Sequence, residues 1–189
     1  MSEILLPKFQ NIKKLIFNGR HFKENEFGFL VPNKTVIVSS AAVGKTWLGE
    51  YYDYIYDLDP KNFSSDANFP FNYVDAALDK LSEHDICLMA FLLQKTRDTY
   101  FPHEFVKNKL NYIIALPKIS GLNLIYERMY NRGDSVEKIQ RFMYYYPIFI
   151  EKFGCLEDSI IIEDDEYLEH TLLRKNIINP DLPSFSLDI

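Results

Sequence analysis

The stretch that decides the fold reads Thr35-Val-Ile-Val-Ser39-Ser-Ala-Ala-Val-Gly44-Lys45-Thr46. Its apolar first half predicts a buried strand, the small residues after it predict a tight loop, and Gly-Lys-Thr stands where a helix is expected to begin. Such a loop wraps a polyphosphate, because its backbone N–H groups point inward and small side chains let them approach the ligand. The positive end of the helix dipole adds to the anion site. This is the layout of a phosphate-binding P-loop, and it predicts a nucleoside triphosphate with Mg²⁺ as the ligand.

Two side chains of this motif carry the expected chemistry. Lys45 would reach the β- and γ-phosphates of ATP, and the hydroxyl of Thr46 would be a Mg²⁺ ligand. The rest of the expected ATP-binding loop is made of Ser39, Ser40, Ala41, Ala42, Val43 and Gly44.

The first position of the motif departs from the usual pattern G-x-x-x-x-G-K-[ST], since Ser39 stands where that pattern has glycine. A serine side chain would be strained if the backbone there took an angle that only glycine tolerates. The alternative to a phosphate site is an ordinary connection between a strand and a helix, with Lys45 exposed to solvent.

Composition limits the possible classes of protein. The chain has 189 residues, of which 47% are hydrophobic, and this is enough for one domain with a sizeable core. A net charge of −6 argues against a general nucleic-acid-binding role. Cys87 and Cys155 lie in apolar surroundings without metal-ligand spacing, so we expect reduced core residues. No signal peptide is recognised and no apolar run reaches the ~18 residues of a membrane span. We therefore expect a cytoplasmic protein with no membrane partner.

Short apolar runs alternate with helical patterns after residue 34. Strands are expected at 35–39, 54–58, 85–91, 112–116 and 159–162, and helices from about residue 44 and over 71–82, 100–110, 122–130, 135–153 and 165–174. This alternation predicts an α/β fold with three layers, a parallel five-stranded sheet between helices. The expected domain spans 35–176. It follows an N-terminal β extension, 1–34, and precedes an irregular tail, 177–189.

The long helix over 135–153 is expected to bury one apolar stripe. The residues at helical spacing on that stripe are Val136, Ile139, Met143, Tyr146, Ile150 and Phe153.

Acidic residues close the second strand of the domain. Asp57 and Asp59 can hold Mg²⁺, orient an acceptor hydroxyl or take its proton. The alternative is a turn-forming aspartate beside Pro60. The third strand has no acidic residue at its carboxyl end, so Asp57 is the better candidate for a Walker-B-like carboxylate.

Three arginines follow other strands or helices of the expected fold. Arg97 comes after the third strand, where a guanidinium can bind the phosphate of an acceptor. Arg128 and Arg132 are four residues apart, share a helix face and precede Gly133, so they could close over a transferring phosphoryl group. Solvated or salt-bridged surface arginines are the alternative for all three.

An aromatic side chain is also placed near the expected acceptor. Phe63 lies in the loop after the second strand, where the base of an acceptor could stack. The alternative for Phe63 is ordinary core packing.

At this point the chain resembles the P-loop nucleoside and nucleotide kinases, most closely the compact nucleotide-kinase-like proteins of bacteriophages that infect low-GC Gram-positive bacteria. The resemblance covers about 35–175. It rests on the P-loop and, in the right order, on Tyr56-Asp57-Leu-Asp59, Tyr126-Glu127-Arg128, Asn131-Arg132-Gly133 and the stretch Ile160 to Leu168.

The resemblance implies strand order 2-3-1-4-5, ATP on the P-loop and an acceptor nucleotide beside the strand-two loop. It implies phosphate and magnesium roles for Lys45 and Thr46, lid roles for Arg128 and Arg132, and a role for Arg97 on the acceptor phosphate. Asp57 or Asp59 would take the acidic role after strand two. A phage-encoded protein of this kind would work in the host cytoplasm.

The leading functional expectation is ATP-dependent phosphoryl transfer to a (deoxy)nucleoside monophosphate. One alternative within enzymes is a nucleoside kinase or an NTPase. Another is a nucleotide-binding protein with weak or no turnover that acts through a protein partner, and Ser39 favours it. Residues 1–34 could serve such a partner or a homodimer.

Overall fold

The computed structural model describes residues 15–17, 20–24, 30–32, 34–90, 111–154, 156 and 159–178. Its centre is one five-stranded sheet in the order β5-β6-β4-β7-β8, and every neighbouring pair of strands is parallel. The strands are β4 (Thr35–Ser39), β5 (Ile55–Asp57), β6 (Ile86–Ala90), β7 (Asn111–Pro117) and β8 (Ser159–Ile162). In chain order this is 2-3-1-4-5, so the predicted fold class and strand order are confirmed.

The strand that carries the motif lies in the middle of the sheet. Each residue of β4 is buried, as the apolar run predicts. Ser39 is paired with Ala90 of β6 on one side and with Ala115 of β7 on the other. The carboxyl ends of these strands are therefore nearly level, and the loops that follow them meet at one edge of the sheet.

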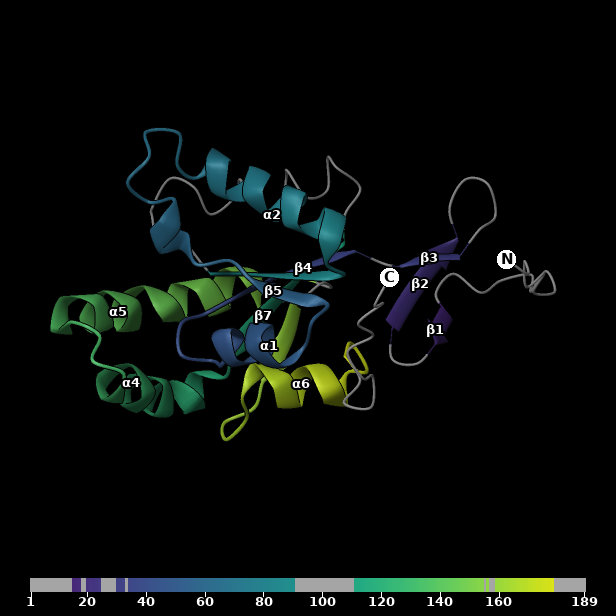
Figure 1. Ribbon diagram of the computed structural model, residues 1–189. Helices are drawn as coiled ribbons and strands as arrows, with labels where there is room; N and C mark the ends of the chain where they lie inside the picture. The colour runs from purple at the N-terminus through teal and green to yellow at the C-terminus, as the bar shows by residue number, and fades with distance from the viewer. Residues whose placement is uncertain are drawn as a thin grey trace.

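Helices cover both faces of the sheet, which gives the predicted three layers (Figure 1). On one face α2 (Phe71–Glu83) packs over Val36 and Val38. On the other face Ile37 belongs to a larger core. That core also takes residues from α1 (Lys45–Tyr51), α4 (Leu122–Asn131), α5 (Val136–Phe153) and α6 (Leu168–Arg174). The alternation of β4 side chains between the two cores follows from the two-residue period of a strand.

The buried stripe of α5 differs from the predicted one. Its buried residues are Ile139, Phe142, Tyr146, Phe149 and Phe153, whereas Val136 is 60% exposed. Met143 and Ile150 are partly buried and pack against the same core, while Phe142 and Phe149, which were not predicted, face it more directly. Phe142 stacks on Tyr146 and Phe149 on Phe153, with ring centroids 4.9 and 5.8 Å apart. A phenylalanine side chain gains more free energy from full burial than a methionine or isoleucine side chain, because its apolar surface is larger.

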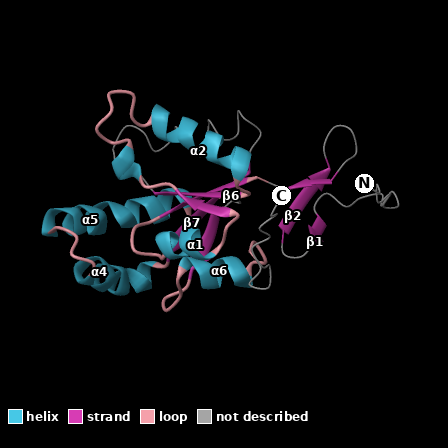
Figure 2. Cartoon of the chain, in the orientation of Figure 1, coloured by secondary structure: helices cyan, strands magenta, loops and turns pink. Residues whose placement is uncertain are grey.

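The remaining elements complete the chain (Figure 2). Strands β1 (Leu15–Phe17), β2 (Arg20–Glu24) and β3 (Leu30–Pro32) form a separate antiparallel sheet ahead of the core. Short 3₁₀ helices η1 (Pro60–Asn62) and η2 (Ile119–Gly121) follow β5 and β7. The last helix begins at Leu168, three residues later than predicted, and the helix predicted at 100–110 lies outside the described residues. Within the described part of the chain, none of the helices has the length and apolarity needed to cross a membrane.

Candidate functional site

The loop between β4 and α1 has the backbone that a phosphate cradle needs. Ala42 and Gly44 have positive φ angles of 59° and 92°. A side chain at Gly44 would be strained at this φ angle. Its Cβ would also lie 3.2 Å from Cδ1 of Tyr167, so that ring would have to shift. The loop is fixed to the last helix, because the Leu168 N–H donates to the Val43 carbonyl at 2.9 Å.

Ser39 is not strained, contrary to the concern raised by its replacement of glycine. It is the last residue of β4, and it is not among the non-glycine residues with positive φ in the described chain. Its hydroxyl is fully buried without a hydrogen-bond partner in the structure. Burying this hydroxyl without a partner lowers the stability of the fold, but the serine does not strain the backbone of the loop.

Lys45 is turned into the loop rather than out to solvent. Its Nζ donates to the carbonyl oxygen of Ser40 at 2.6 Å. Burial lowers the pKa of Lys45 to about 8; Arg132 and Lys138 also lower it, and Asp57 and Asp59 oppose the shift. Lys45 therefore lacks the solvent exposure that the alternative of an ordinary strand–helix connection expects.

Thr46 and Asp57 meet across the site. The Thr46 hydroxyl donates to Oδ2 of Asp57 at 2.8 Å, and Oδ1 of that carboxylate is buried without a hydrogen-bond partner. Burial raises the pKa of Asp57, against the opposing effects of Lys45 and the Thr46 hydrogen bond. The described residues hold no cluster of three or more His, Cys, Asp or Glu side chains for a metal. One hydroxyl and one carboxylate with a free oxygen do fit Mg²⁺, which commonly takes few protein ligands and completes its shell with phosphates and water.

A glycine in α1 brings these two residues together. A Cβ on Gly49 would lie 3.0 Å from both the Cβ and the backbone nitrogen of Asp57. The helix thus packs directly on the end of β5, and only glycine permits that approach.

Gly49→Ala is therefore expected to push α1 away from β5 and to lower the free energy of unfolding by about 1–3 kcal/mol. Because Thr46 lies on the same helix, its contact with Asp57 should lengthen and Mg²⁺-dependent nucleotide binding should weaken. Denaturant unfolding and titration calorimetry measure the two effects. The control is Glu50→Ala, an exposed position of the same helix, where stability should change by no more than about 0.5 kcal/mol. Equal stability of the two variants would contradict the close packing.

Asp59 has a structural task as well as a place at the site. Its Oδ1 accepts a hydrogen bond from the Lys61 N–H at 2.9 Å and caps η1, as the turn-forming alternative predicts. The aromatic residue of this loop, Phe63, packs against Tyr73 with ring centroids 5.5 Å apart and is not part of the cavity wall described below. The structure thus places Phe63 in its core-packing alternative.

Of the three arginines predicted for the site, Arg128 and Arg132 are described, and both line the cavity and have partners there. The Arg128 guanidinium lies 3.7 Å above the ring of Tyr167 and donates to the Glu166 carbonyl at 3.2 Å. Arg132 donates through Nε and Nη2 to Asp134. Arg97 lies outside the described residues.

Sequence reasoning missed a second cation beside Arg132. Lys138, in the first turn of α5, donates to Oδ1 of Asp134 at 2.7 Å, so this carboxylate holds two cations at once. Burial alone would raise the pKa of Asp134, but these two ion pairs hold that pKa below its ordinary value. The four-residue spacing of Asp134 and Lys138 was the available signal.

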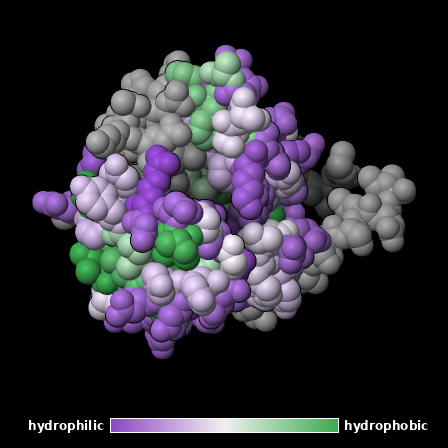
Figure 3. All heavy atoms as spheres, turned by 90° about the vertical axis from the view of Figure 1, so that its left-hand side faces the viewer, coloured by the Kyte–Doolittle hydropathy of each residue, from purple (hydrophilic) through white to green (hydrophobic). Residues whose placement is uncertain are grey.

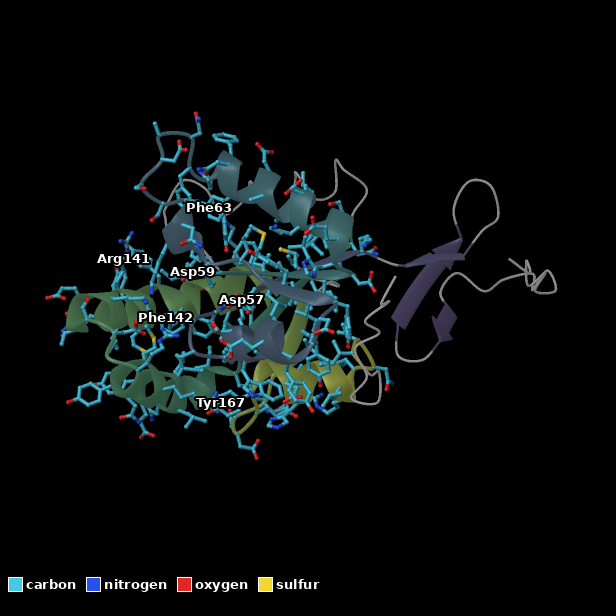
Figure 4. All side chains as sticks on the ribbon, in the orientation of Figure 1. Asp57, Asp59, Phe63, Arg141, Phe142 and Tyr167 are labelled. Atoms are coloured by element: carbon cyan, nitrogen blue, oxygen red, sulfur yellow. The ribbon has the colours of Figure 1, made fainter. Side chains whose placement is uncertain are left out.

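A fully buried tyrosine supports the site from behind. Tyr73 joins the ends of β5 and β6, since its hydroxyl donates to the Leu58 carbonyl and accepts from the Ala90 N–H, both at 2.9 Å. Figure 4 shows Asp57 at the end of β5 and Asp59 just after it, with Arg141 and Phe142 on α5 to their left and Tyr167 below them. No sequence pattern marks a place on the cavity wall for Tyr167.

A cavity of about 1000 Å³ lies at the carboxyl edge of the sheet, and the P-loop, Asp57, Asp59, Arg128, Arg132 and Tyr167 are part of its wall. The face of the molecule toward which the α4–α5 turn points carries mostly hydrophilic side chains with a hydrophobic area among them (Figure 3). The cavity wall contains five cations and two carboxylates, in a chain whose net charge is −6. The charged side chains are Lys45, Lys61, Arg128, Arg132, Lys138, Asp57 and Asp59. An excess of cations in a concave site favours an anionic ligand.

Neither a protein-family model nor a curated protein matches this chain. Among solved structures, it is similar to a gluconokinase from Sinorhizobium meliloti 1021, with a TM-score of 0.49 and 10% sequence identity over 77% of this chain and 90% of the gluconokinase chain. Values this low do not carry an activity from one protein to another, so the function is argued from the residues of this chain.

Proposed function

We propose that this chain is a kinase that transfers the γ-phosphoryl group of ATP to a (deoxy)nucleoside monophosphate. The observation that supports this most is the meeting of Lys45, Thr46 and Asp57 at one end of a cationic cavity. An ammonium group, a hydroxyl and a carboxylate with a free oxygen are the groups that a magnesium–triphosphate complex requires.

The donor would bind along the loop between β4 and α1. The positive φ angles of Ala42 and Gly44 turn the loop back on itself, which suits it to surround an anion with backbone N–H groups. The ammonium group of Lys45 would exchange the Ser40 carbonyl for phosphate oxygens. Since burial already disfavours its charge in the free protein, a phosphate partner should restore full protonation.

Thr46 and Asp57 would hold Mg²⁺. When bound, the ion would supply charge neutralisation of the β- and γ-phosphates. Around it, the chain's own groups orient the phosphates: Lys45 from the loop, and Arg132 and Lys138 from the α4–α5 turn. Arginine and lysine near the transferring group stabilise the negative charge on its oxygens.

The acceptor would occupy the part of the cavity beyond Asp57. The wall there offers Asp59 and Lys61, and the prediction for Arg97 as ligand of the acceptor phosphate stays open because that residue is not described. A flat base finds apolar lining on α4 and α5, from Met129, Phe142, Tyr146 and Phe149.

A nucleoside kinase is the second candidate, and the free Oδ1 of Asp57 favours it. This oxygen has no hydrogen-bond partner, and burial raises the pKa of the group. A carboxylate with a raised pKa is better suited to accept the proton of an attacking hydroxyl than one with the ordinary value.

The test is ADP formation from Mg-ATP in the presence of a panel of nucleosides and nucleoside monophosphates. ADP that depends on a monophosphate supports the proposal, and ADP that depends on a nucleoside supports the second candidate. ADP formed equally with and without acceptors indicates an NTPase. Tight ATP binding without ADP indicates a binding protein.

The protonation of Lys45 predicts a pH dependence of ATP binding. Below pH 8 the Lys45 ammonium group is charged in the free protein, so the ATP affinity should not change with pH on its account. Above pH 8 the free protein loses this proton, so the affinity should fall by up to about tenfold per pH unit until about pH 10. Calorimetry at several pH values measures it. Lys45→Arg keeps its charge over this range and should show no such fall; a level affinity of the wild-type protein up to pH 10 would contradict the buried position of Lys45.

A further inference from the structure

An aromatic side chain borders the cavity directly after the proposed phosphate ligands. Trp47 follows Lys45 and Thr46 on α1 and is part of the cavity wall. It is the one tryptophan of the chain, and it is 46% exposed. So large an apolar side chain gains free energy by being covered, which makes its exposure at a cavity notable.

The indole of Trp47 is held in place by neighbouring rings. It stacks on Tyr51, one turn further along α1, with ring centroids 4.7 Å apart and planes inclined by 12°. Its edge meets Tyr52 at 6.3 Å, and the hydroxyl of buried Tyr52 donates to Glu169 of α6 at 3.0 Å. Tyr51 thus backs one face of the indole. A ring held in this way loses little conformational entropy when a ligand stacks on it.

The other exposed aromatic ring beside the loop is already in use. Tyr167 has the Arg128 guanidinium over its ring and Gly44 packed against its edge. Its backbone N–H donates to Nδ1 of His170 at the start of α6. Tyr167 therefore supports the loop, whereas Trp47 offers aromatic surface to the cavity.

The aromatic ring and the proposed phosphate ligands come from the same end of α1 and line one cavity. Lys45 and Thr46 suit the β- and γ-phosphates and their metal ion. The α-phosphate and nucleoside must then lie elsewhere in the same cavity, and Trp47, which follows Thr46 on α1, also lines that cavity.

We propose that Trp47, backed by Tyr51, is the stacking platform for the base of the nucleoside triphosphate. This inference rests on the proposed function, since it requires the phosphates to lie on the loop. Stacking on an aromatic ring strengthens binding of a nucleotide while adding nothing to the binding of its phosphates alone. The platform therefore distinguishes ATP from a bare polyphosphate.

The test compares Mg-ATP with Mg-tripolyphosphate, which has the phosphates but no base. In the wild-type protein ATP should quench the fluorescence of Trp47, and tripolyphosphate should displace the ATP and restore it. By calorimetry, Trp47→Leu should weaken ATP binding by about tenfold or more and leave tripolyphosphate binding within about twofold. Trp47→Phe keeps an aromatic face and should retain most of the ATP affinity.

Two results would overturn the platform alone. The first is ATP binding without a change in Trp47 fluorescence. The second is an equal loss of affinity for ATP and for tripolyphosphate in Trp47→Leu, because an equal loss indicates a purely structural role of the side chain. In both cases the phosphate site would stand. Failure of both ligands to bind the wild-type protein would overturn the phosphate site, and the platform with it.

Discussion

Lys45→Ala is expected to lower the affinity for Mg-ATP by about 100-fold or more, because it removes the ammonium group that faces the inside of the loop. Charge-assisted hydrogen bonds to phosphate are stronger than neutral ones, and two of them account for a loss of this size. The fold should survive, since burial already destabilises the charged form of this side chain. Titration calorimetry measures the affinity, and circular dichroism checks the fold.

The matched control for this variant is Lys175→Ala. Lys175 follows α6, is exposed and is not part of the cavity wall, so its removal changes the net charge equally. Its ATP affinity should stay within about twofold of wild type, as expected for a distant surface charge. Equal affinities of the Lys45 and Lys175 variants would remove Lys45 from the site.

Asp57→Asn is expected to lower the rate of ADP formation by about 100- to 1000-fold. Asparagine has the same shape and can still accept the Thr46 hydrogen bond, but it lacks the negative charge that holds Mg²⁺ or takes a proton. Binding of ATP without Mg²⁺ should therefore be kept while the stimulation by Mg²⁺ is lost. Steady-state kinetics over a range of Mg²⁺ concentrations measures both effects.

A control for Asp57→Asn comes from the loop that follows β5. Asp66 is exposed and its Oδ1 accepts from the Asn68 N–H at 2.7 Å, a bond that asparagine can also make. Asp66→Asn should have wild-type activity. Wild-type turnover in Asp57→Asn, at any Mg²⁺ concentration, would show that this carboxylate does not act in the reaction.

The parallel sheet and the place of the loop could be predicted because they follow from local signals, whereas the strand order was expected only from the resemblance to P-loop kinases. Apolar runs mark the strands, and parallel strands bring their carboxyl ends to one edge, so Asp57 was expected near Thr46. The contact between them depends on Gly49, however, and nothing in the sequence shows that this glycine lies against β5.

The parts that escaped prediction depend on tertiary geometry. The α4–α5 turn brings Arg132 and Lys138 to the carboxylate of Asp134. These ion pairs hold both cations at the cavity wall, a placement that the sequence alone does not show. The face of α5 was predicted only in part, because Phe142 and Met143 fit the helical spacing equally well and only packing decides which of them is fully buried. Phe63 illustrates the same limit, since an aromatic residue in a loop has no local sign of where its ring packs.

The most direct measurement for the whole account is the change in backbone amide chemical shifts when Mg-ATP is titrated into ¹⁵N-labelled protein. If phosphates lie against the loop, the amides of Ala41 to Thr46 should show the largest shifts, saturating with one ATP per chain. If those amides stay unchanged at millimolar ATP, or the largest shifts lie elsewhere in the chain, the loop between β4 and α1 does not bind phosphate and the proposed kinase activity is contradicted.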